Sequence, residues 1–380
     1  MYDDGTNRIF NLPVAELSSI ASQVLGAEAA SLGTVSVEKI GRSVGAATVG
    51  IYRVVGQART SAGEQTWSAV AKVLRVTEET PPDALRELEV YRSGVFAELP
   101  GLRSARWYAT QAGDGLQVLW LEDLSAAPQA PWMPEYYVEA ARHLGQFNAN
   151  WPEHALPEWA WLNQSSFTQT FRNERYSKAF GKLPARQDEP PINRLVRADT
   201  AGRLISLWTA SERLFAQVEA TSKGICHQDC HPKNLFPMAA TTTQAHTIAI
   251  DWASVGVGCM GIDIGHLLGS PISWLEISLD SAIRLVEPIF EAYLAGLKQA
   301  GWTGYELQVR LTYLTRLGCE ANRLVPIALA AVADPKIRAL FEALTRHPLE
   351  EIFERWGDAL PFFLDQTDQA LALASQLRAQ

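Results

Sequence analysis

The sequence has few cysteines, no excess of basic residues and no long apolar run. It contains four cysteines among 380 residues. These are too few for a disulfide framework in a chain of this length, so we expect a reducing, cytoplasmic environment. No stretch of about 18 uncharged apolar residues occurs, and no membrane span is therefore expected. The acidic start, MYDDGTNRIF, is not typical of a signal peptide.

The charge of the chain limits its partners. There are 42 acidic residues against 33 Lys and Arg, which gives a formal net charge of −9. Nonspecific nucleic-acid binding needs a basic surface, so nucleic acid is not an expected partner. An acidic surface favours a cationic small molecule as a partner. The alternative is that the negative net charge serves only to keep the protein in solution. The sequence does not indicate an oligomeric state.

The first third of the chain has the pattern of β-strands. Apolar and polar residues alternate in TVSVEKIG, and two similar runs follow after short connections, which predicts a β-meander. A proline pair then begins a segment with apolar residues at helical spacing, and two further strands are expected after it. The predicted strands span 34–41, 47–56, 66–75, 104–110 and 116–124, and the predicted helix spans 81–99.

After Pro134 the pattern becomes helical. EYYVEAARHLGQFNANW has one helical face that includes Asn148. We interpret the proline- and charge-rich stretch 181–194 as a loop and 224–252 as a short β-rich island. Helices are expected from about Pro271 onward.

These patterns predict an α+β fold with two lobes. A small β-rich lobe would occupy residues 1–123, and a larger, mostly helical lobe would occupy residues 124–380. With 47% hydrophobic and 20% charged residues, the composition is that of an ordinary globular protein.

The segment 226–234 reads CHQDCHPKN and admits two interpretations. Its two cysteines and two histidines could bind zinc. Structural zinc sites, however, usually join two ligand pairs that are separated by a longer arm. Here the ligands lie in one tight segment, and no second C-x-x-C or H-x-x-x-H pair occurs elsewhere. Zinc is therefore the weaker interpretation.

The stronger interpretation is a catalytic loop. His227, Asp229 and Asn234 have the spacing H-x-D-x-x-x-x-N, and an apolar strand that ends in Asp251 follows. Phosphoryl transfer needs a carboxylate that orients or deprotonates the attacking hydroxyl, together with oxygen ligands that hold Mg²⁺ against the nucleotide phosphates. Strands over NLFP and TIAID would bring Asn234 and Asp251 together at one end of a hairpin.

These residues resemble the aminoglycoside phosphotransferase/choline kinase family, which has the protein-kinase-like bilobal fold. HQDCHPKNLF resembles the family's catalytic loop, and Asp251 in HTIAIDW resembles its metal-binding aspartate. GIDIGHLL, with Asp263, resembles the segment that follows that aspartate. The resemblance implies that residues 1–123 bind the nucleotide and that residues 124–380 carry the catalytic loop and the substrate pocket.

The resemblance implies a role for each polar residue of the loop. Asp229 would act as the base, Asn234 and Asp251 would hold Mg²⁺, and His227 would orient the loop by hydrogen bonding. Lys233 stands where a small residue is common in the family. It could neutralise charge on the transferred phosphoryl group, or it could be an exposed loop lysine.

In the N-terminal lobe the resemblance implies a nucleotide site. Lys72, in VAKVLR, would contact the phosphates. Glu87 would pair with this lysine, and Glu89 is the alternative partner. The backbone of the connector LWLEDL would hydrogen-bond the adenine, which involves Glu122, Asp123 and Leu124.

The loop that would cover the phosphates is GRSVGAATVG, which includes Gly41 and Gly45. It lacks a G-x-G-x-x-G pattern, and taken alone it resembles an ordinary turn between strands. His143 and His266 are interpreted as structural or surface residues.

The function implied is O-phosphorylation of a small molecule with ATP, or with GTP in its place, and Mg²⁺. Protein kinases need an A-P-E segment to dock peptides, and none follows Asp251. The expected acceptor is therefore a hydroxyl on a small molecule such as choline, a sugar or an aminoglycoside. The alternative is a nucleotide-binding pseudokinase or regulatory module. The presence of the whole set counts against it: Lys72, Asp229, Asn234 and Asp251.

The identity of the acceptor is left open by the sequence. Trp151, Trp159, Trp161 and Glu320 could together hold a cationic acceptor by charge and cation–π contact. The alternative is that the tryptophans only pack within the helical lobe.

Overall fold

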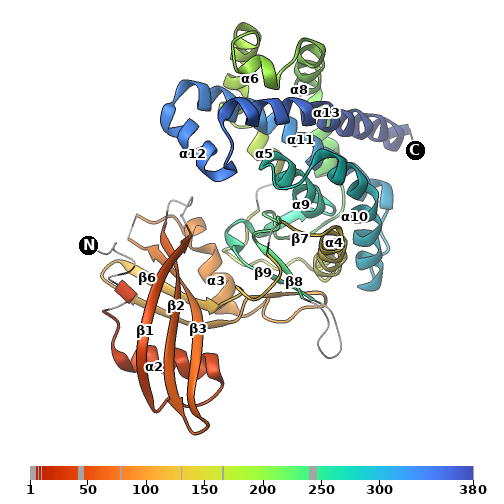
Figure 1. Ribbon diagram of the computed structural model, residues 1–380. Helices are drawn as coiled ribbons and strands as arrows, with labels where there is room; N and C mark the ends of the chain where they lie inside the picture. The colour runs from red at the N-terminus through yellow and green to blue at the C-terminus, as the bar shows by residue number, and fades with distance from the viewer. Residues whose placement is uncertain are drawn as a thin grey trace. The chain divides into compact units, whose positions relative to one another are not determined.

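The computed structural model describes residues 6, 8, 9, 11–41, 47–77, 79–129, 131–164, 167–238 and 246–379. Two compact units divide the chain (Figure 1). The β-rich unit comprises Met1–Leu99, Arg103–Pro128 and Ile248–Ala253, and the helical unit comprises Pro100–Leu102, Gln129–Thr247 and Ser254–Gln380. Among the residues described, no helix is both long enough and apolar enough to cross a membrane.

A five-stranded antiparallel sheet forms most of the β-rich unit (Figure 1). Its strand order is β1-β2-β3-β6-β5. Strand β2 buries alternate residues, as the sequence predicts, and β3 does so until residues 71–74, which are all buried. The strands are β1, Ser31–Gly41; β2, Thr48–Thr60; β3, Gly63–Arg75; β5, Trp107–Gly113; and β6, Leu116–Glu122.

Helix α2, Val14–Leu25, packs against this sheet. Its Ile20 is buried in the same apolar core as Tyr52 of β2 and Trp67 of β3. The sequence analysis assigned no element to these residues.

Helix α3, Arg86–Ser93, follows a 3-10 turn over Pro82–Leu85. It is shorter than the predicted helix over 81–99 because Gly94 takes a left-handed conformation, φ 64°, and ends it. Glu87 and Tyr91 are buried on its inner face.

The helical unit is mainly α-helical, as the pattern after Pro134 predicts (Figure 1). Helix α10 packs along α4, and α11 packs against both α9 and α13. The helices are α4, Pro134–Ala149; α5, Phe167–Phe171; α6, Glu174–Arg186; α7, Ile192–Leu195; α8, Ala198–Glu219; α9, Ile262–Ser273; α10, Leu279–Gln299; α11, Glu306–Ala333; α12, Pro335–Thr345; and α13, Leu349–Ala379.

The prediction that 181–194 is a loop is wrong at both ends, since α7 also begins within this stretch, at Ile192. Helix α6 continues to Arg186, with Pro184 inside it. Phe180 of α6 stacks on Trp208 of α8 with ring centroids 4.2 Å apart. This tertiary packing outweighs the unfavourable local propensity of proline for a helix.

Two small sheets flank the CHQDCHPKN segment. Strand β7, Lys223–Cys226, pairs antiparallel with β10, Gly256–Cys259. The other sheet has the order β4-β9-β8, so that β8 and β9 are neighbours, as the predicted hairpin requires. Its strands are β4, Leu102–Ser104; β8, Leu235–Met238; and β9, His246–Ala249.

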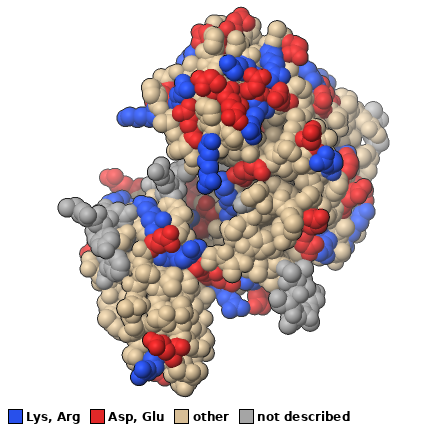
Figure 2. Space-filling view, in the orientation of Figure 1, with Lys and Arg blue, Asp and Glu red and all other residues tan. Residues whose placement is uncertain are grey.

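The predicted α+β class, with an antiparallel sheet first and a mostly helical remainder, is confirmed. Acidic and basic side chains are intermixed over α12 and α13 of the helical unit (Figure 2). Arg197, for example, contacts Glu354 at 3.0 Å and Asp358 at 2.7 Å. Exposed pairs of this kind contribute little to stability, so the core carries most of it.

Candidate active site

One buried carboxylate fixes the start of the catalytic-loop segment by hydrogen bonds. Asp263, at the start of α9, is fully buried and accepts hydrogen bonds from two consecutive backbone N–H groups. The N–H of His227 donates to its Oδ2 at 3.0 Å, and the N–H of Gln228 donates to its Oδ1 at 2.8 Å. The resemblance in GIDIGHLL thus corresponds to a physical contact that fixes where the loop begins.

Asp263 is itself positioned by a buried polar chain. Asn148 of α4 donates to Asp263 Oδ2 at 3.0 Å and to the carbonyl of Ile225 at 2.8 Å. The hydroxyl of Tyr293 in α10 donates to Asn148 Oδ1 at 2.7 Å. Since unpaired buried polar groups cost free energy, these hydrogen bonds fix α4, α9, α10 and the loop in one arrangement.

Two motif residues have left-handed backbone conformations. Gln228 has φ 65° and Asp251 has φ 58°. Glycine adopts a positive φ without strain, so Gln228 occupies a backbone position that glycine would fill more easily. Non-glycine residues in this region cost free energy and are concentrated at functional sites.

Asp229 and Asn234 contact one another within the loop. The side-chain amide nitrogen of Asn234 donates to Asp229 Oδ2 at 3.0 Å and to the backbone carbonyl of Asp229 at 3.1 Å. The Asp229 side chain is 34% exposed, so its carboxylate remains accessible to a small molecule. Both contacts use the amide nitrogen of Asn234 and do not involve its amide oxygen.

The other two loop residues differ in burial. His227 is fully buried, and its Nδ1 accepts a hydrogen bond from the N–H of Asp229 at 3.3 Å, which fits an orienting role. Lys233 is exposed, and its ammonium group forms an ion pair with Glu276. Its exposure agrees with the alternative of an exposed loop lysine, and a role in neutralising phosphoryl charge stays a prediction.

In the β-rich unit, Lys72 contacts two carboxylates. It is buried in β3, and its ammonium group contacts Glu87 of α3 and Asp251 Oδ1, the latter at 3.1 Å. Burial acts to lower the pKa of Lys72, but the two carboxylates outweigh burial and raise the pKa above its ordinary value. Glu89, the alternative partner, pairs instead with Arg92 on the surface of α3. Lys72 is therefore a fixed, fully protonated cation.

The two predicted metal ligands, Asp251 of the β-rich unit and Asn234 of the helical unit, are both oxygen donors. Asp251 offers carboxylate oxygens on a side chain that is 43% exposed, and Asn234 offers an amide oxygen. Oxygen ligands of this kind are preferred by Mg²⁺, which retains several waters and needs few protein ligands. Across the described parts of the chain, no three His, Cys, Asp or Glu side chains form a group that could hold a metal alone.

The cysteines are part of the core. Cys226 and Cys230 are buried, and burial raises the pKa of both thiols. A zinc ligand must be a thiolate, so this environment opposes the zinc interpretation.

The connector after β6 uses its acidic side chains for structure. Glu122 accepts two hydrogen bonds from Arg103, at 2.7 and 3.0 Å. Asp123 accepts hydrogen bonds from Ser68 and, at 3.0 Å, from the N–H of Ser125. Any contact of Glu122, Asp123 or Leu124 with an adenine would thus involve backbone groups, as the sequence analysis expects.

Of the two loop glycines, one lies within the described structure. Gly41 ends β1, where an added Cβ would lie 3.3 Å from the side chain of Ile51, so close packing is one reason for glycine. Gly45 lies outside the described residues.

The suggestion that Glu320 holds a cationic acceptor is wrong. Glu320 is fully buried in α11, with Arg316 donating to its Oε1 at 2.6 Å and Arg323 to its Oε2 at 2.7 Å. The tryptophans contact each other, since Trp159 stacks on Trp161 with centroids 4.9 Å apart. These contacts favour the packing alternative.

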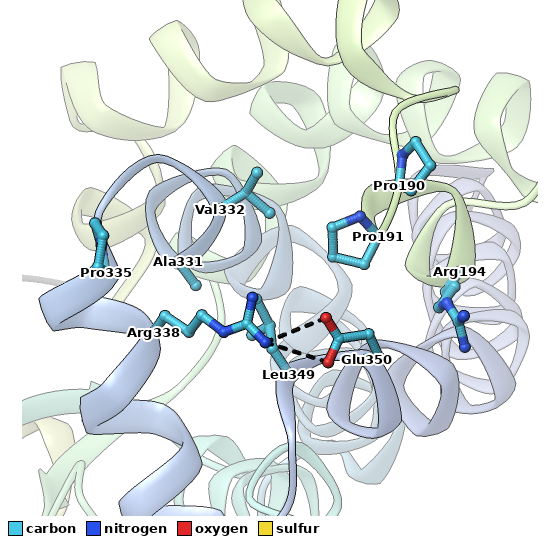
Figure 3. Close-up of a pocket in the computed structure, with 9 residues that line it drawn as sticks. All are labelled: Pro190, Pro191, Arg194, Ala331, Val332, Pro335, Arg338, Leu349 and Glu350. Carbon is cyan, nitrogen blue, oxygen red and sulfur yellow. Dashed lines mark hydrogen bonds and ion pairs between the residues drawn. The ribbon is translucent and has the colours of Figure 1, made fainter.

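A cavity of ≈ 400 Å³ lies elsewhere in the helical unit (Figure 3). Arg338 and Glu350 form an ion pair across it at 3.2 Å, and prolines form much of its wall. None of the motif residues lines it, so it is not the active site. Its lining consists of Pro190, Pro191, Arg194, Ala331, Val332, Pro335, Arg338, Leu349 and Glu350.

Two histidines lie near Asp229 Oδ1: His231 of the loop, with its Nε2 at 3.8 Å, and His266, which sequence reasoning missed. His266 of α9, interpreted above as structural or a surface residue, has its Nε2 3.5 Å from Asp229 Oδ1. Its only sequence signal is its position three residues after Asp263, one helical turn further along α9.

Comparisons with known proteins identify the family and the fold of this chain. The model of the phosphotransferase enzyme family matches residues 57–307. The solved structure of a microcompartment-associated aminopropanol kinase is 12% identical, with a TM-score of 0.51 over 88% of this chain and 94% of that chain. At this identity the likeness shows the fold alone.

Two other solved structures are similar at lower scores. A spectinomycin phosphotransferase, in complex with ADP and spectinomycin, is 10% identical, with a TM-score of 0.48 over 94% of this chain and 99% of that chain. An aminoglycoside phosphotransferase from Alicyclobacillus acidocaldarius is 15% identical, with a TM-score of 0.47 over 87% and 93%. The search of curated proteins gave no match. Because the family model spans more than half of the chain, this protein belongs to the phosphotransferase enzyme family, as its motifs predict.

Proposed function

We propose that this enzyme transfers the terminal phosphoryl group of ATP, or of GTP, to a hydroxyl group of a small molecule. The observation that carries the proposal is the state of Asp229. Its carboxylate is accessible, lies on a loop fixed by Asp263, and accepts a hydrogen bond from Asn234 at 3.0 Å. A carboxylate held in this way can orient an acceptor hydroxyl.

Asp229, Lys72 and His227 have different roles in the proposed reaction. Asp229 accepts a hydrogen bond from the acceptor hydroxyl and takes its proton as the hydroxyl oxygen bonds to phosphorus. Lys72, kept cationic by Glu87, binds phosphate oxygens as a point charge. His227 holds the backbone of Asp229 in place. The contribution of these residues is alignment and charge stabilisation.

The nucleotide would supply the phosphoryl group and its leaving group, and Mg²⁺ would neutralise phosphate charge. Asn234 and Asp251 would hold the metal ion. The ion pair between Asp251 and Lys72 supports this assignment, because it places a carboxylate beside the cation that would bind the phosphates.

The acceptor class is tested by a screen of hydroxyl-bearing small molecules. Purified enzyme with Mg·ATP is incubated with aminoglycosides, choline, aminoalcohols and sugars, and ADP release is measured. We expect at least one compound to raise ADP release well above the rate without acceptor. A nucleotide-binding pseudokinase would bind ATP but show no acceptor-dependent ADP release with any compound.

Asp251→Ala should weaken the binding of Mg·ATP as well as turnover. The substitution removes a proposed metal ligand and one of the two carboxylates that contact Lys72. The measurement is titration calorimetry with a non-hydrolysable ATP analogue, with and without Mg²⁺. Mg²⁺ should strengthen binding to the wild type much more than binding to the variant.

Asp114→Ala is a matched control for this experiment. Asp114 is also an aspartate with a left-handed backbone, φ 55°, but its side chain is almost fully exposed in a turn. It should bind Mg·nucleotide like the wild type. An unchanged Mg²⁺ effect in Asp251→Ala would remove Asp251 from the metal site.

A further inference from the structure

His266 contacts the proposed base from a neighbouring helix. It lies on α9, it is mostly buried, and its Nε2 lies 3.5 Å from Asp229 Oδ1. Asn234 donates to the other oxygen, Oδ2. The 3.5 Å separation is longer than a formed hydrogen bond, but contacts at catalytic sites commonly shorten when substrate binds.

The second ring nitrogen of His266 contacts a permanent donor. Arg316 of α11 has its Nη2 2.5 Å from His266 Nδ1. A guanidinium group has no acceptor and stays protonated, so Nδ1 must be the acceptor in this contact. The proton of the neutral ring then lies on Nε2, the nitrogen that faces Asp229. Burial and then the charge of Arg316 lower the pKa of His266, which is consistent with a neutral ring.

Arg316 is itself held by hydrogen bonds. It is buried, and its Nη1 donates to Glu320 Oε1 at 2.6 Å. Glu320 also accepts from Arg323 and, at 2.8 Å, from the hydroxyl of Ser273. Hydrogen bonds between buried groups such as Arg316 and Glu320 restrict the rotamers of their side chains.

Two glycines of α9 allow this network to form. An added Cβ on Gly265 would lie 2.7 Å from the Cβ of Arg316, and one on Gly269 would lie 2.7 Å from the Cγ of Glu320. Side chains at these positions would force α9 and α11 apart. Glycine therefore lets the two helices approach closely enough for Arg316 to reach His266.

We infer that His266 is a positioning residue for Asp229. Its Nε2–H, fixed by Arg316, holds Oδ1 of the carboxylate, and the side-chain amide of Asn234 holds Oδ2. This inference rests on the proposed function for its kinetic consequence, because the base must face the acceptor hydroxyl. It assigns His266 no proton transfer.

The kinetic test compares two substitutions with a control. His266→Leu removes the donor, whereas in His266→Gln the Nε2 amide can replace the imidazole Nε2. We expect His266→Leu to lower kcat about 10- to 100-fold, the usual effect of losing a group that orients a functional side chain. The KM for ATP should be unchanged, and His266→Gln should recover most of kcat.

His143→Gln is the matched control. His143 is also a buried histidine of the helical unit, but it contacts Thr247 at 3.0 Å and Glu139 at 3.1 Å, and not Asp229. It should keep the wild-type kcat. Equal kcat values in wild type and His266→Leu, or equal losses in the Leu and Gln variants, would overturn the inference.

A second measurement does not depend on activity. In enzyme labelled with ¹⁵N-histidine, NMR shifts of the ring nitrogens report the tautomer, and the His266→Gln spectrum identifies the His266 signals. We expect the neutral Nε2–H form, with a shift of that signal in Asp229→Asn. An imidazolium or Nδ1–H form would overturn the inference. Absence of phosphotransfer in the wild type would instead refute the proposed function. The NMR result would still show whether His266 Nε2–H contacts Asp229.

Discussion

Asp229→Ala is expected to lower kcat by about 10²- to 10⁴-fold, the usual contribution of a positioned base. The affinity for Mg·ATP should remain close to that of the wild type. The reason is that Asp229 faces the acceptor hydroxyl in the proposed reaction, whereas the metal and the phosphates are assigned to Asn234, Asp251 and Lys72. The measurements are steady-state kinetics with the acceptor found in the screen and nucleotide titration of the same preparations.

Two further variants make this result specific. Asp229→Asn keeps the size of the side chain but removes the carboxylate, and it should lose as much activity as Asp229→Ala. Asp280→Asn, at an exposed position in the first turn of α10, should behave like the wild type. Turnover retained in Asp229→Ala would remove Asp229 from the role of base.

Glu320→Gln is expected to destabilise the folded protein by about 3–5 kcal/mol near neutral pH, as when one partner of a buried ion pair is removed. Glu320 is fully buried and neutralises two arginines, Arg316 and Arg323, which would then lack a carboxylate. Equilibrium denaturant unfolding of the variant and the wild type measures the difference.

The difference in free energy of unfolding between wild type and Glu320→Gln should depend on pH. Burial acts to raise the pKa of Glu320, but Arg323 and Arg316 outweigh burial and lower it from 4.5 to about 2. A carboxyl group with a lowered pKa in the folded state contributes stability above its unfolded pKa and loses that contribution as the pH falls. The gap between wild type and Glu320→Gln should therefore be full above pH 4.5 and shrink between 4.5 and about 2.

Glu174→Gln provides the control for stability. Glu174 also pairs with a cation four residues away, Lys178 at 2.8 Å, but both side chains are exposed. This substitution should change the free energy of unfolding by about 0.5 kcal/mol or less. If Glu320→Gln is no more destabilising than Glu174→Gln, the buried network does not hold α9 and α11 in place.

Local motifs made much of the site predictable. The H-x-D-x-x-x-x-N spacing fixes which residues share one loop, and the contact of Asn234 with Asp229 follows from that spacing. Lys72 lies in a strand that the sequence predicts, and helical spacing places Glu87 and Tyr91 on the inner side of α3. The strand and helix positions of these residues follow from periodicity, whereas the pairing of Lys72 with Glu87 was implied by the family resemblance.

The long-range contacts were not predictable in the same way. Asn148 and Asp263 are 115 residues apart, and His266 and Arg316 are 50 apart, so no local spacing relates them. Glu320 illustrates the difficulty, since an acidic residue in a polar helical sequence looks available for a ligand. Its burial depends on the close packing of α9 and α11, which two glycines permit.

The most direct test of the proposed chemistry is ³¹P NMR of the reaction of wild-type enzyme with ATP, Mg²⁺ and the acceptor selected by the screen. We predict that ADP and a phosphate ester of the acceptor appear in equal amounts, and that neither appears with Asp229→Ala. Formation of ADP with inorganic phosphate alone, or of the ester at the wild-type rate in Asp229→Ala, would contradict transfer to an acceptor hydroxyl held by Asp229.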